Sequence, residues 1–266
     1  MNALEAIDQH CKQLRLSSLA QALPEALTLA GQQEWSLESF LLYLLEQEVT
    51  RRQERRIERY LRESKLPPGK TLGQFDLKRL PLRLQRQIPR LAQGEFIKQA
   101  ENILLFGRPG TGKTHLAAGL AHEWVQRGYR VFFTPAFKLV DALLRAKRDY
   151  ELEHHLKRLD RFQVVILDDI GYVQQSREEM EVLFTFLAER YERRSVVITS
   201  NLVFSQWDQI FKDPLTTAAA IDRVVHHSRI IEFGSDMGSV RAEQAAKRQQ
   251  VELSQDVSDQ SETSQN

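Results

Sequence analysis

The stretch GRPGTGKT at residues 107–114 decides the fold, because it matches the pattern G-x-x-x-x-G-K-[ST] at every fixed position. Its glycines let backbone N–H groups curl around phosphates, Lys113 supplies a positive charge for the β- and γ-phosphates, and the Thr114 hydroxyl is a ligand for Mg²⁺. The apolar run NILLF comes directly before it and a helical pattern follows, so a helix N-terminus adds its partial positive charge. The sequence therefore predicts a nucleotide-binding loop lined by Gly107, Pro109, Gly110, Thr111, Gly112, Lys113, Thr114 and His115.

Two adjacent carboxylates follow the apolar run VVIL at residues 164–167. Carboxylates are costly to bury without a cation, so we expect Asp168 to hold Mg²⁺ and Asp169 to polarise the attacking water. The alternative is a solvent-exposed strand end with two ordinary acids. The next apolar run ends in Thr-Ser-Asn, where the Asn201 amide can position water beside the γ-phosphate, although Ser-Asn is also an ordinary turn.

Short apolar runs alternate with helical patterns along this part of the chain, which predicts an α/β fold with a parallel sheet covered on both faces. The predicted strands are 102–106, 129–134, 164–167, 195–199 and 229–233. The predicted helices are 113–127, 136–148, 151–161, 176–194 and 214–227. Only 33 residues follow Phe233, and many of them lack an apolar pattern, so no multi-helix lid fits after the fifth strand.

The breaker Pro67-Pro68-Gly69 divides the chain. Before it, apolar residues at helical spacing and an Arg-rich stretch over 49–66 predict a small all-helical domain at residues 1–68. After it, residues 69–248 contain the alternating pattern and form the second predicted domain. Residues 249–266 carry four acidic and no basic side chains and no apolar pattern, so we expect a disordered acidic tail.

Charge is balanced over the whole chain and uneven along it. With 37 Lys plus Arg and 36 Asp plus Glu among 266 residues, the formal net charge is +1, a balance typical of a globular protein that excludes a wholly disordered or fibrous one. Residues 51–100 carry 14 basic and 5 acidic side chains, whereas residues 1–50 carry 2 and 7. This asymmetry indicates a nucleic-acid or other acidic partner for the basic block.

The sequence also carries signals about compartment. Cys11 is the single cysteine, which excludes an intramolecular disulfide and a Cys-based zinc site. The first residues lack a signal-peptide pattern, and no apolar run approaches the roughly 18 residues that span a membrane. We therefore expect a cytoplasmic location and no membrane partner.

The order of these motifs, followed by Asp222-Arg223, resembles the AAA+ ATPases. More narrowly, GRPGTGKTHLAAGLA, VVILDDIGY, VITSN and AAIDRVVHHSRIIEF are similar to the IstB/DnaC group of bacterial transposition helper ATPases and helicase loaders. The stretch LLEQEVTRRQERRIERYLRESKLPPGKTLGQFD is similar to the IstB branch, so the resemblance covers about residues 5–245. It implies an AAA+ P-loop three-layer sandwich with a five-stranded parallel sheet and no C-terminal lid, and ATP with Mg²⁺ as cofactors. Phe75 then lies near the adenine, unless it is a packed core side chain.

The resemblance implies roles for three further polar side chains. Arg223 matches the arginine finger that reaches from one subunit into its neighbour's ATP, and Asn201 matches the sensor at the strand tip. Arg241 matches a second sensor arginine, although this sequence has Val240 where the family usually has an aromatic residue. The site then needs a homo-oligomer for turnover. From the residues alone, Arg223 also fits a helix-surface ion pair with an acid such as Glu192.

One basic stripe lies before the breaker. Arg51, Arg55 and Arg59 fall on one face of a predicted helix, and such a stripe can neutralise phosphates along a duplex. The same spacing fits a solvated helix with ion pairs to Glu54 or Glu58. We hold both interpretations open.

A second basic region lies between the second and third predicted strands, where residues 136–161 add two helices and a simple fold needs one. By the resemblance, Lys138, Arg145 and Arg148 line a DNA path in an oligomer; an ordinary charged surface is the alternative. Contacts of this kind hold phosphates without reading sequence. We therefore expect non-specific, ATP-promoted and salt-sensitive binding of double-stranded DNA.

The leading hypothesis for function is an ATPase that oligomerises on duplex DNA, hydrolyses ATP at subunit interfaces and presents target DNA to a partner transposase of the same insertion sequence. The alternative is a replicative helicase loader, because both use the same ATP machinery. A third class is a DNA-bending or scaffold protein in which ATP acts as a structural switch. Steady-state turnover separates the third class from a cycling ATPase.

Overall fold

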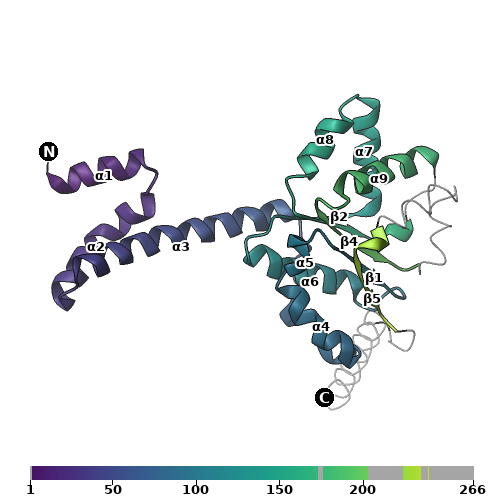
Figure 1. The fold of residues 1–266 in the computed structure, drawn as a ribbon, viewed down its shortest axis with the longest axis horizontal. Coiled ribbons are helices and arrows are strands. Elements are labelled where there is room, and N and C mark those ends of the chain that lie inside the picture. Colours follow the sequence, from purple (N-terminus) through teal and green to yellow (C-terminus); the bar gives the residue numbers. More distant parts are fainter. Residues whose placement is uncertain (1, 173–175, 203–223, 235–238, 240–266) are drawn as a thin grey trace, which may run out of the picture. The chain divides into compact units, whose positions relative to one another are not determined.

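The computed structural model describes residues 2–172, 176–202, 224–234 and 239 (Figure 1). The chain divides into two compact units, Met1–Arg62 and Glu63–Asn266. This division falls inside the predicted Arg-rich helix, a few residues before the Pro-Pro-Gly breaker. The predicted boundary at residue 68 and the acidic tail at 249–266 stay predictions, the tail because it lies outside the described residues.

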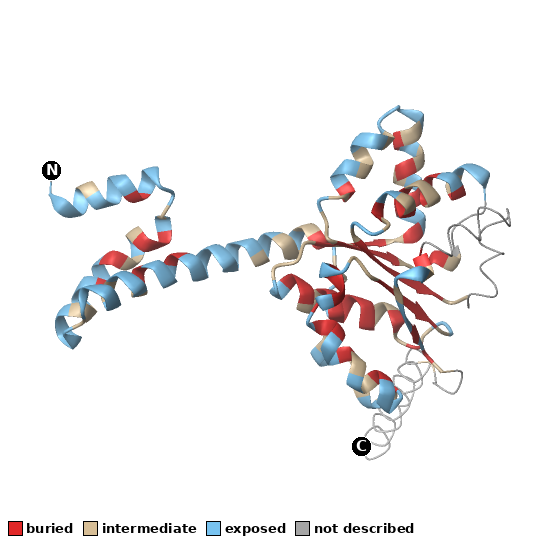
Figure 2. Ribbon diagram, viewed as in Figure 1, coloured by how far each residue is buried: buried red, intermediate tan, exposed pale blue. Residues whose placement is uncertain are grey.

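The first unit is built from helices, as the sequence predicted. They are α1 (Ala3–Gln13), α2 (Ser17–Gln33) and α3, which begins at Leu37 and runs on to Ser64. The start of α3 is capped locally, because Ser36 Oγ accepts a hydrogen bond from the Ser39 backbone N–H at 3.2 Å. The core is small and is formed by Cys11, Leu19, Leu23, Ala26 and Leu44. Most of the surface of these helices is exposed (Figure 2).

A buried carboxylate joins α2 to α3 within this unit. Residue Leu16, at the N-cap of α2, provides no side-chain hydrogen bond. Instead Glu48 Oε2 accepts from the backbone N–H groups of Ser18 and Leu19 at 2.8 and 3.0 Å. Its other oxygen accepts from Arg52 Nε at 2.6 Å. Burial raises the pKa of Glu48, but the backbone donors and Arg52 outweigh it and hold that pKa below its ordinary value.

The second unit contains a five-stranded parallel sheet with strand order β2-β3-β4-β1-β5, which confirms the predicted fold class. The strands are β1 (Asn102–Phe106), β2 (Val131–Pro135), β3 (Val164–Asp168), β4 (Ser195–Ser200) and β5 (Ser228–Glu232). The three inner strands are buried along almost their whole length, which explains their continuous apolar sequences. Because β4 lies between β1 and β3, the carboxyl ends of all three meet at one edge of the sheet.

Helices cover both faces of this sheet and complete a three-layer sandwich (Figure 1). On one face α6 (Lys113–Gln126) packs against the strands and carries α4 (Leu82–Ala92) and α5 (Glu95–Lys98). On the other face lie α7 (Ala136–Arg148), α8 (Leu152–Leu159) and α9 (Arg177–Arg190). The short 3-10 helices are η1 (Leu72–Gln74), η2 (Leu77–Arg79) and η3 (Ile170–Tyr172). The buried side chains concentrate in the strands and in α6 (Figure 2).

Two buried polar side chains hold the amino ends of the strands together. Asn102 Oδ1 accepts from the Val196 backbone N–H at 2.8 Å, and its Nδ2 donates to the Val224 carbonyl at 3.2 Å. The guanidinium of Arg190 donates to four carbonyls that flank β3 and β4, those of Leu159, Phe162, Gln163 and Ser195. Burial lowers the pKa of Arg190 to about 9. These contacts set strand positions at the edge of the sheet opposite the carboxyl ends.

Within the described ranges, no helix is both long enough and apolar enough to cross a membrane. The expected absence of a C-terminal lid concerns residues that follow position 239, which lie outside those ranges.

Candidate functional site

The predicted phosphate-binding loop connects β1 to α6, the strand–loop–helix context that such a loop requires. Gly112 is the N-cap of α6 and has a φ of 101°, in the left-handed region that favours glycine. A Cβ at this position would come 3.0 Å from the ring of Phe75. At Gly110, with a φ of 82°, a Cβ would collide with Ser239. Glycine is therefore required at both positions by backbone conformation and by close neighbours.

Lys113 lies inside the loop. Its side chain is buried, and Nζ donates to the carbonyls of Gly107 and Arg108 at 2.6 and 2.9 Å. The loop therefore holds an ammonium group beside the first turn of α6, the end at which a helix presents its backbone N–H groups. A buried positive charge at a helix N-terminus favours an anion beside it. Thr114 follows on the same turn and is half-buried.

The two predicted carboxylates lie one strand away from this loop. Asp168 is the last residue of β3, and Asp169 follows it with a φ of 58°. Thr199 on β4 lies beside both: its hydroxyl donates to Asp168 Oδ1 at 2.7 Å and accepts from the Asp169 backbone N–H at 2.9 Å. The Asp168 carboxylate thus faces the neighbouring strand β4, and both acidic residues are half-buried. A cluster of carboxylate and hydroxyl oxygens at this edge fits a hard divalent cation such as Mg²⁺.

Asn201 follows β4 at the same edge. The Gly107 N–H donates to the carbonyl of the preceding Ser200 at 3.3 Å, so the tip of β4 is joined to the start of the phosphate loop. Asn201 Oδ1 is buried and has no hydrogen-bond partner among the described residues. It is close enough to Gly171 that a Cβ there would collide with it. A buried acceptor without a partner can still accept a hydrogen bond from a bound water or ligand.

A segment before β1 covers the first turns of α6. The carbonyl of Thr71 lies 3.0 Å from His115 Nε2. The rings of Phe75 and His115 meet edge to face with centroids 5.4 Å apart. A Cβ at Gly119 would lie 2.9 Å from the Leu72 backbone, so η1 packs directly on α6. Phe75 and His115 are therefore close to the phosphate loop, and the adenine contact of Phe75 stays a prediction.

Two predicted catalytic side chains, Arg223 and Arg241, lie outside the described residues. From the sequence, a role was predicted for Asn201 in the segment Thr-Ser-Asn, but none for Thr199. The signal was present, since a Thr within a fully apolar strand is a buried hydroxyl that must find a partner. Which partner it finds depends on the strand order, which the sequence did not reveal.

The predicted basic stripe on α3 is partly engaged inside its own unit. Arg51 Nη1 pairs with Glu54 Oε2 at 2.8 Å. Arg55 Nη1 donates to Ser17 Oγ at 3.2 Å. Arg59 is exposed and stacks its guanidinium 5.5 Å from the ring of Tyr60. The structure therefore shows the ion pair for Arg51, whereas Arg59 has no ion pair with any described residue.

The predicted basic residues of α7 are exposed and also differ in their pairing. Arg148 lies 3.9 Å from Glu178 of α9, a weak ion pair at the limit of contact. Lys138 lies 6.0 Å from the ring of Phe137. Arg145 has no ion pair with any described residue.

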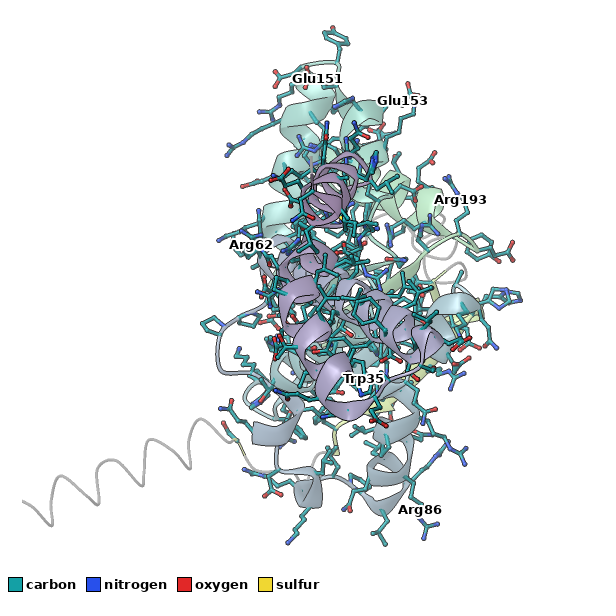
Figure 3. All side chains as sticks on the ribbon, turned by 90° about the vertical axis from the view of Figure 1, so that its left-hand side faces the viewer. Trp35, Arg62, Arg86, Glu151, Glu153 and Arg193 are labelled. Carbon is teal, nitrogen blue, oxygen red and sulfur yellow. The ribbon has the colours of Figure 1, made fainter. Side chains whose placement is uncertain are left out.

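A third basic face lies on α4 and was not singled out from the sequence. Leu84, Ile88 and Leu91 bury one side of this helix. On the other side, exposed guanidinium groups recur at helical spacing, and no described acid pairs with them: Arg83, Arg86 and Arg90. Figure 3 shows the Arg86 side chain directed away from the ribbon. We call these three residues the α4 face; among the described residues, no acid neutralises their charge.

The fold and the loop define an α/β protein with a P-loop between β1 and α6. The AMPPCP-bound DnaA structure from Aquifex aeolicus has a TM-score of 0.53 and 21% identity, over 67% of this chain and 54% of that one. The DnaI crystal structure has a TM-score of 0.54 and 22% identity, over 64% of this chain and 96% of that one. At these identities the likeness concerns the fold.

The chain belongs to the family of IstB-like ATP binding proteins, which matches residues 9–248. It is 41% identical to a putative insertion sequence ATP-binding protein of Sinorhizobium fredii, over 88% of this chain and 79% of the relative. It is 37% identical to the insertion sequence IS21 putative ATP-binding protein of Pseudomonas aeruginosa, over 88% and 87%. It is 35% identical to the corresponding IS5376 protein of Geobacillus stearothermophilus, over 92% and 98%. The resemblance to the IstB branch is confirmed.

Proposed function

We propose that this protein binds and hydrolyses ATP with Mg²⁺ and uses the cycle to assemble on double-stranded DNA for transposition. The observation that carries the proposal is the arrangement at one sheet edge: a buried Lys113 inside the loop, and two consecutive acids that one hydroxyl contacts, Asp168 through its carboxylate and Asp169 through its backbone N–H. This edge combines a positively charged loop, which suits the phosphates, with oxygen ligands, which suit Mg²⁺. A Mg²⁺-nucleotide requires both. The ATP-binding family and the IS21-type relatives support it.

Each side chain has a definite task in this proposal. Lys113 and the loop N–H groups hold the β- and γ-phosphates, and Thr114 and Asp168 are the protein's ligands for the cation. Bound Mg²⁺ would neutralise charge on the phosphates as the γ-phosphoryl group transfers. Asp169 orients and polarises the attacking water, and the unpartnered Asn201 oxygen completes that water's hydrogen bonds.

Turnover then depends on assembly. Arg223 acts as the finger in a neighbouring subunit's site and Arg241 as a second sensor, by the family resemblance. A finger in trans contributes about 10³- to 10⁵-fold to the rate in related phosphoryl transfers. A dilute monomer should therefore bind ATP and hydrolyse it slowly, and turnover per subunit should rise with protein concentration and with duplex DNA.

The DNA contacts are the exposed cations on α3, α7 and α4. We place Arg51, Arg55 and Arg59 of α3 and Lys138, Arg145 and Arg148 of α7 against phosphates, and the unpaired α4 face joins them. Such contacts position a protein on a duplex without reading sequence. Multiplied by oligomerisation, they would hold DNA and present it to a partner transposase in the bacterial cytoplasm. The insertion sequence relatives favour this role over a replicative helicase loader.

The test is ATP hydrolysis by the purified full chain over a range of protein concentrations, with and without duplex DNA. We expect DNA-stimulated turnover that rises more than linearly with protein. Arg223→Ala should keep nucleotide binding and lose turnover. Electron microscopy with ATP, ADP or no nucleotide should show ATP-dependent rings or spirals on DNA. Turnover that is linear in protein and unchanged in Arg223→Ala would contradict the shared site.

A further inference from the structure

The hydroxyl of Thr199 contacts both consecutive acids of the site, Asp168 through its carboxylate and Asp169 through its backbone N–H. Thr199 is fully buried on β4, where it pairs in register with Leu105 of β1, and its hydroxyl reaches the end of β3 on the other side. The hydroxyl has a single proton, which it donates to Asp168 Oδ1 at 2.7 Å. As an acceptor it takes the Asp169 N–H at 2.9 Å. Both ends of this hydroxyl are therefore committed to consecutive acidic residues of the neighbouring strand.

The backbone explains why the contact is needed. Asp168 is in the strand conformation, whereas Asp169 has a φ of 58°, which residues other than glycine rarely adopt. The chain therefore turns sharply between the two acids, and the Asp169 N–H leaves the strand ladder. A buried N–H must be paired, and the Thr199 hydroxyl pairs it. Without that acceptor, the unfavourable turn loses its support from β4.

The same strand carries Asn201 two residues further on. If the tip of β4 moves, Asp168 and Asp169 should move with it, because both are hydrogen-bonded to Thr199. These hydrogen bonds, at 2.7 and 2.9 Å, are short and would break if the strands separated. The tip is also joined to the phosphate loop through the hydrogen bond from Gly107 to Ser200. Thr199 thus lies on the strand between β1, which leads into the phosphate loop, and β3, which ends in Asp168.

We propose that Thr199 is a positioning residue that orients Asp168 toward the cation and fixes the turn that places Asp169 at the attacking water. This inference rests on the ATP hydrolysis proposed above. Thr199 contacts neither nucleotide nor water in this role; it acts through the two acids. The hydroxyl donates to Oδ1 of Asp168, and Oδ2 would then be available to a bound cation.

The test compares Thr199→Val, which keeps the shape and loses the hydroxyl, with Thr199→Ser, which keeps the hydroxyl. Binding of a fluorescent ATP analogue is measured with and without Mg²⁺, and turnover is measured against Mg²⁺ concentration. Outer-shell partners of metal ligands change metal affinity or activity by about 10- to 100-fold. We expect Thr199→Val to keep its Mg²⁺-free nucleotide affinity, to need at least about tenfold more Mg²⁺ and to lose most turnover. Thr199→Ser should restore both.

The matched control is Thr134→Val on β2. Thr134 is also a buried strand threonine, and its hydroxyl donates only to the carbonyl of the next residue, Pro135, at 3.2 Å. It should leave the Mg²⁺ response unchanged. If Thr199→Val does not fold, Thr199→Ala gives the same comparison against Thr199→Ser.

The outcomes distinguish failure of the proposed ATPase function from failure of the positioning role of Thr199. Wild-type protein that neither binds nor hydrolyses ATP overturns the proposed function. Wild-type turnover with an unchanged Mg²⁺ requirement in a folded Thr199→Val or Thr199→Ala overturns the positioning role alone. An equal loss in Thr199→Ser and Thr199→Val does the same, because it points to packing and not to the hydroxyl.

Discussion

The nucleotide site and the basic faces use charge in opposite ways. At the site, Lys113, Asp168 and Asp169 are half-buried or buried, and strand and loop atoms set their positions at distances near 3 Å or less. On α3, α4 and α7, the guanidinium and ammonium groups are exposed, and what distinguishes them is whether an acid lies beside them. At the site, what a charged group can bind depends on where the surrounding atoms hold it. On the surface helices, it depends on whether a neighbouring acid already neutralises the charge.

The largest effect should come from the buried cation of the site. We expect Lys113→Ala to weaken nucleotide binding by at least about 100-fold, because it removes the charge that faces the phosphates. The measurement is a titration with a fluorescent ATP analogue. The control is Lys98→Ala, since Lys98 is exposed and paired with Glu95 at 3.0 Å. Equal affinities in the two variants would contradict the site and remove the contrast between buried and surface charge.

The second effect separates paired from unpaired surface cations. Replacing the α4 face (Arg83, Arg86 and Arg90) with alanine should weaken duplex binding by about tenfold or more and lower the salt slope by about two to three, at roughly 0.9 per lost phosphate contact. The matched triple of Arg51, Arg55 and Arg59 should cost less, because Arg51 already pairs with Glu54. The triple of Lys138, Arg145 and Arg148 should fall between them.

These three variants are compared by affinity at several salt concentrations, with circular dichroism as the check on folding. Alanine is the best helix former, so the helices should survive. A larger loss from the α3 triple than from the α4 triple would show that local pairing does not predict which face meets DNA.

The smallest effect concerns a carboxylate that is buried but structural. We expect Glu48→Gln to destabilise the first unit by about 1 kcal/mol, because the amide keeps one acceptor for the start of α2 and loses the charged contact to Arg52. The control is Glu54→Gln in an exposed pair, which should cost less than about 0.5 kcal/mol. Denaturant unfolding followed by circular dichroism measures both. Equal losses would contradict the capping role of Glu48.

The same contact predicts a pH dependence. The folded pKa of Glu48 lies below its ordinary value of 4.5, so its stabilisation is fully present above that value. As the pH falls through the lower, folded pKa, the carboxylate protonates and the stabilisation is lost. Acid should therefore destabilise wild type more steeply than Glu48→Gln, and parallel curves would contradict this assignment.

Much of the site was predictable because its signals are local in sequence. The phosphate loop, the strand that ends in Asp168 and the strand tip followed by Asn201 each depend on neighbouring residues. The structure has strands at all five predicted places, with ends that agree to within two residues. The ion pairs on α3 were also foreseeable, because residues three or four apart share a helix face. The helix α4 was not predicted at all, and the pairing of its arginines depends on which acids pack nearby.

The sequence by itself therefore determined the parallel α/β class, the phosphate loop and the residues that end its strands, because backbone periodicity and glycine spacing act over a few residues. Only the tertiary structure decided the strand order β2-β3-β4-β1-β5. That order places Thr199 against Asp168 across 31 residues of chain. It was also tertiary packing that set Glu48 at the start of α2 across 30 residues. Such contacts follow from which hydrophobic faces bury one another, and burial is a property of the whole fold.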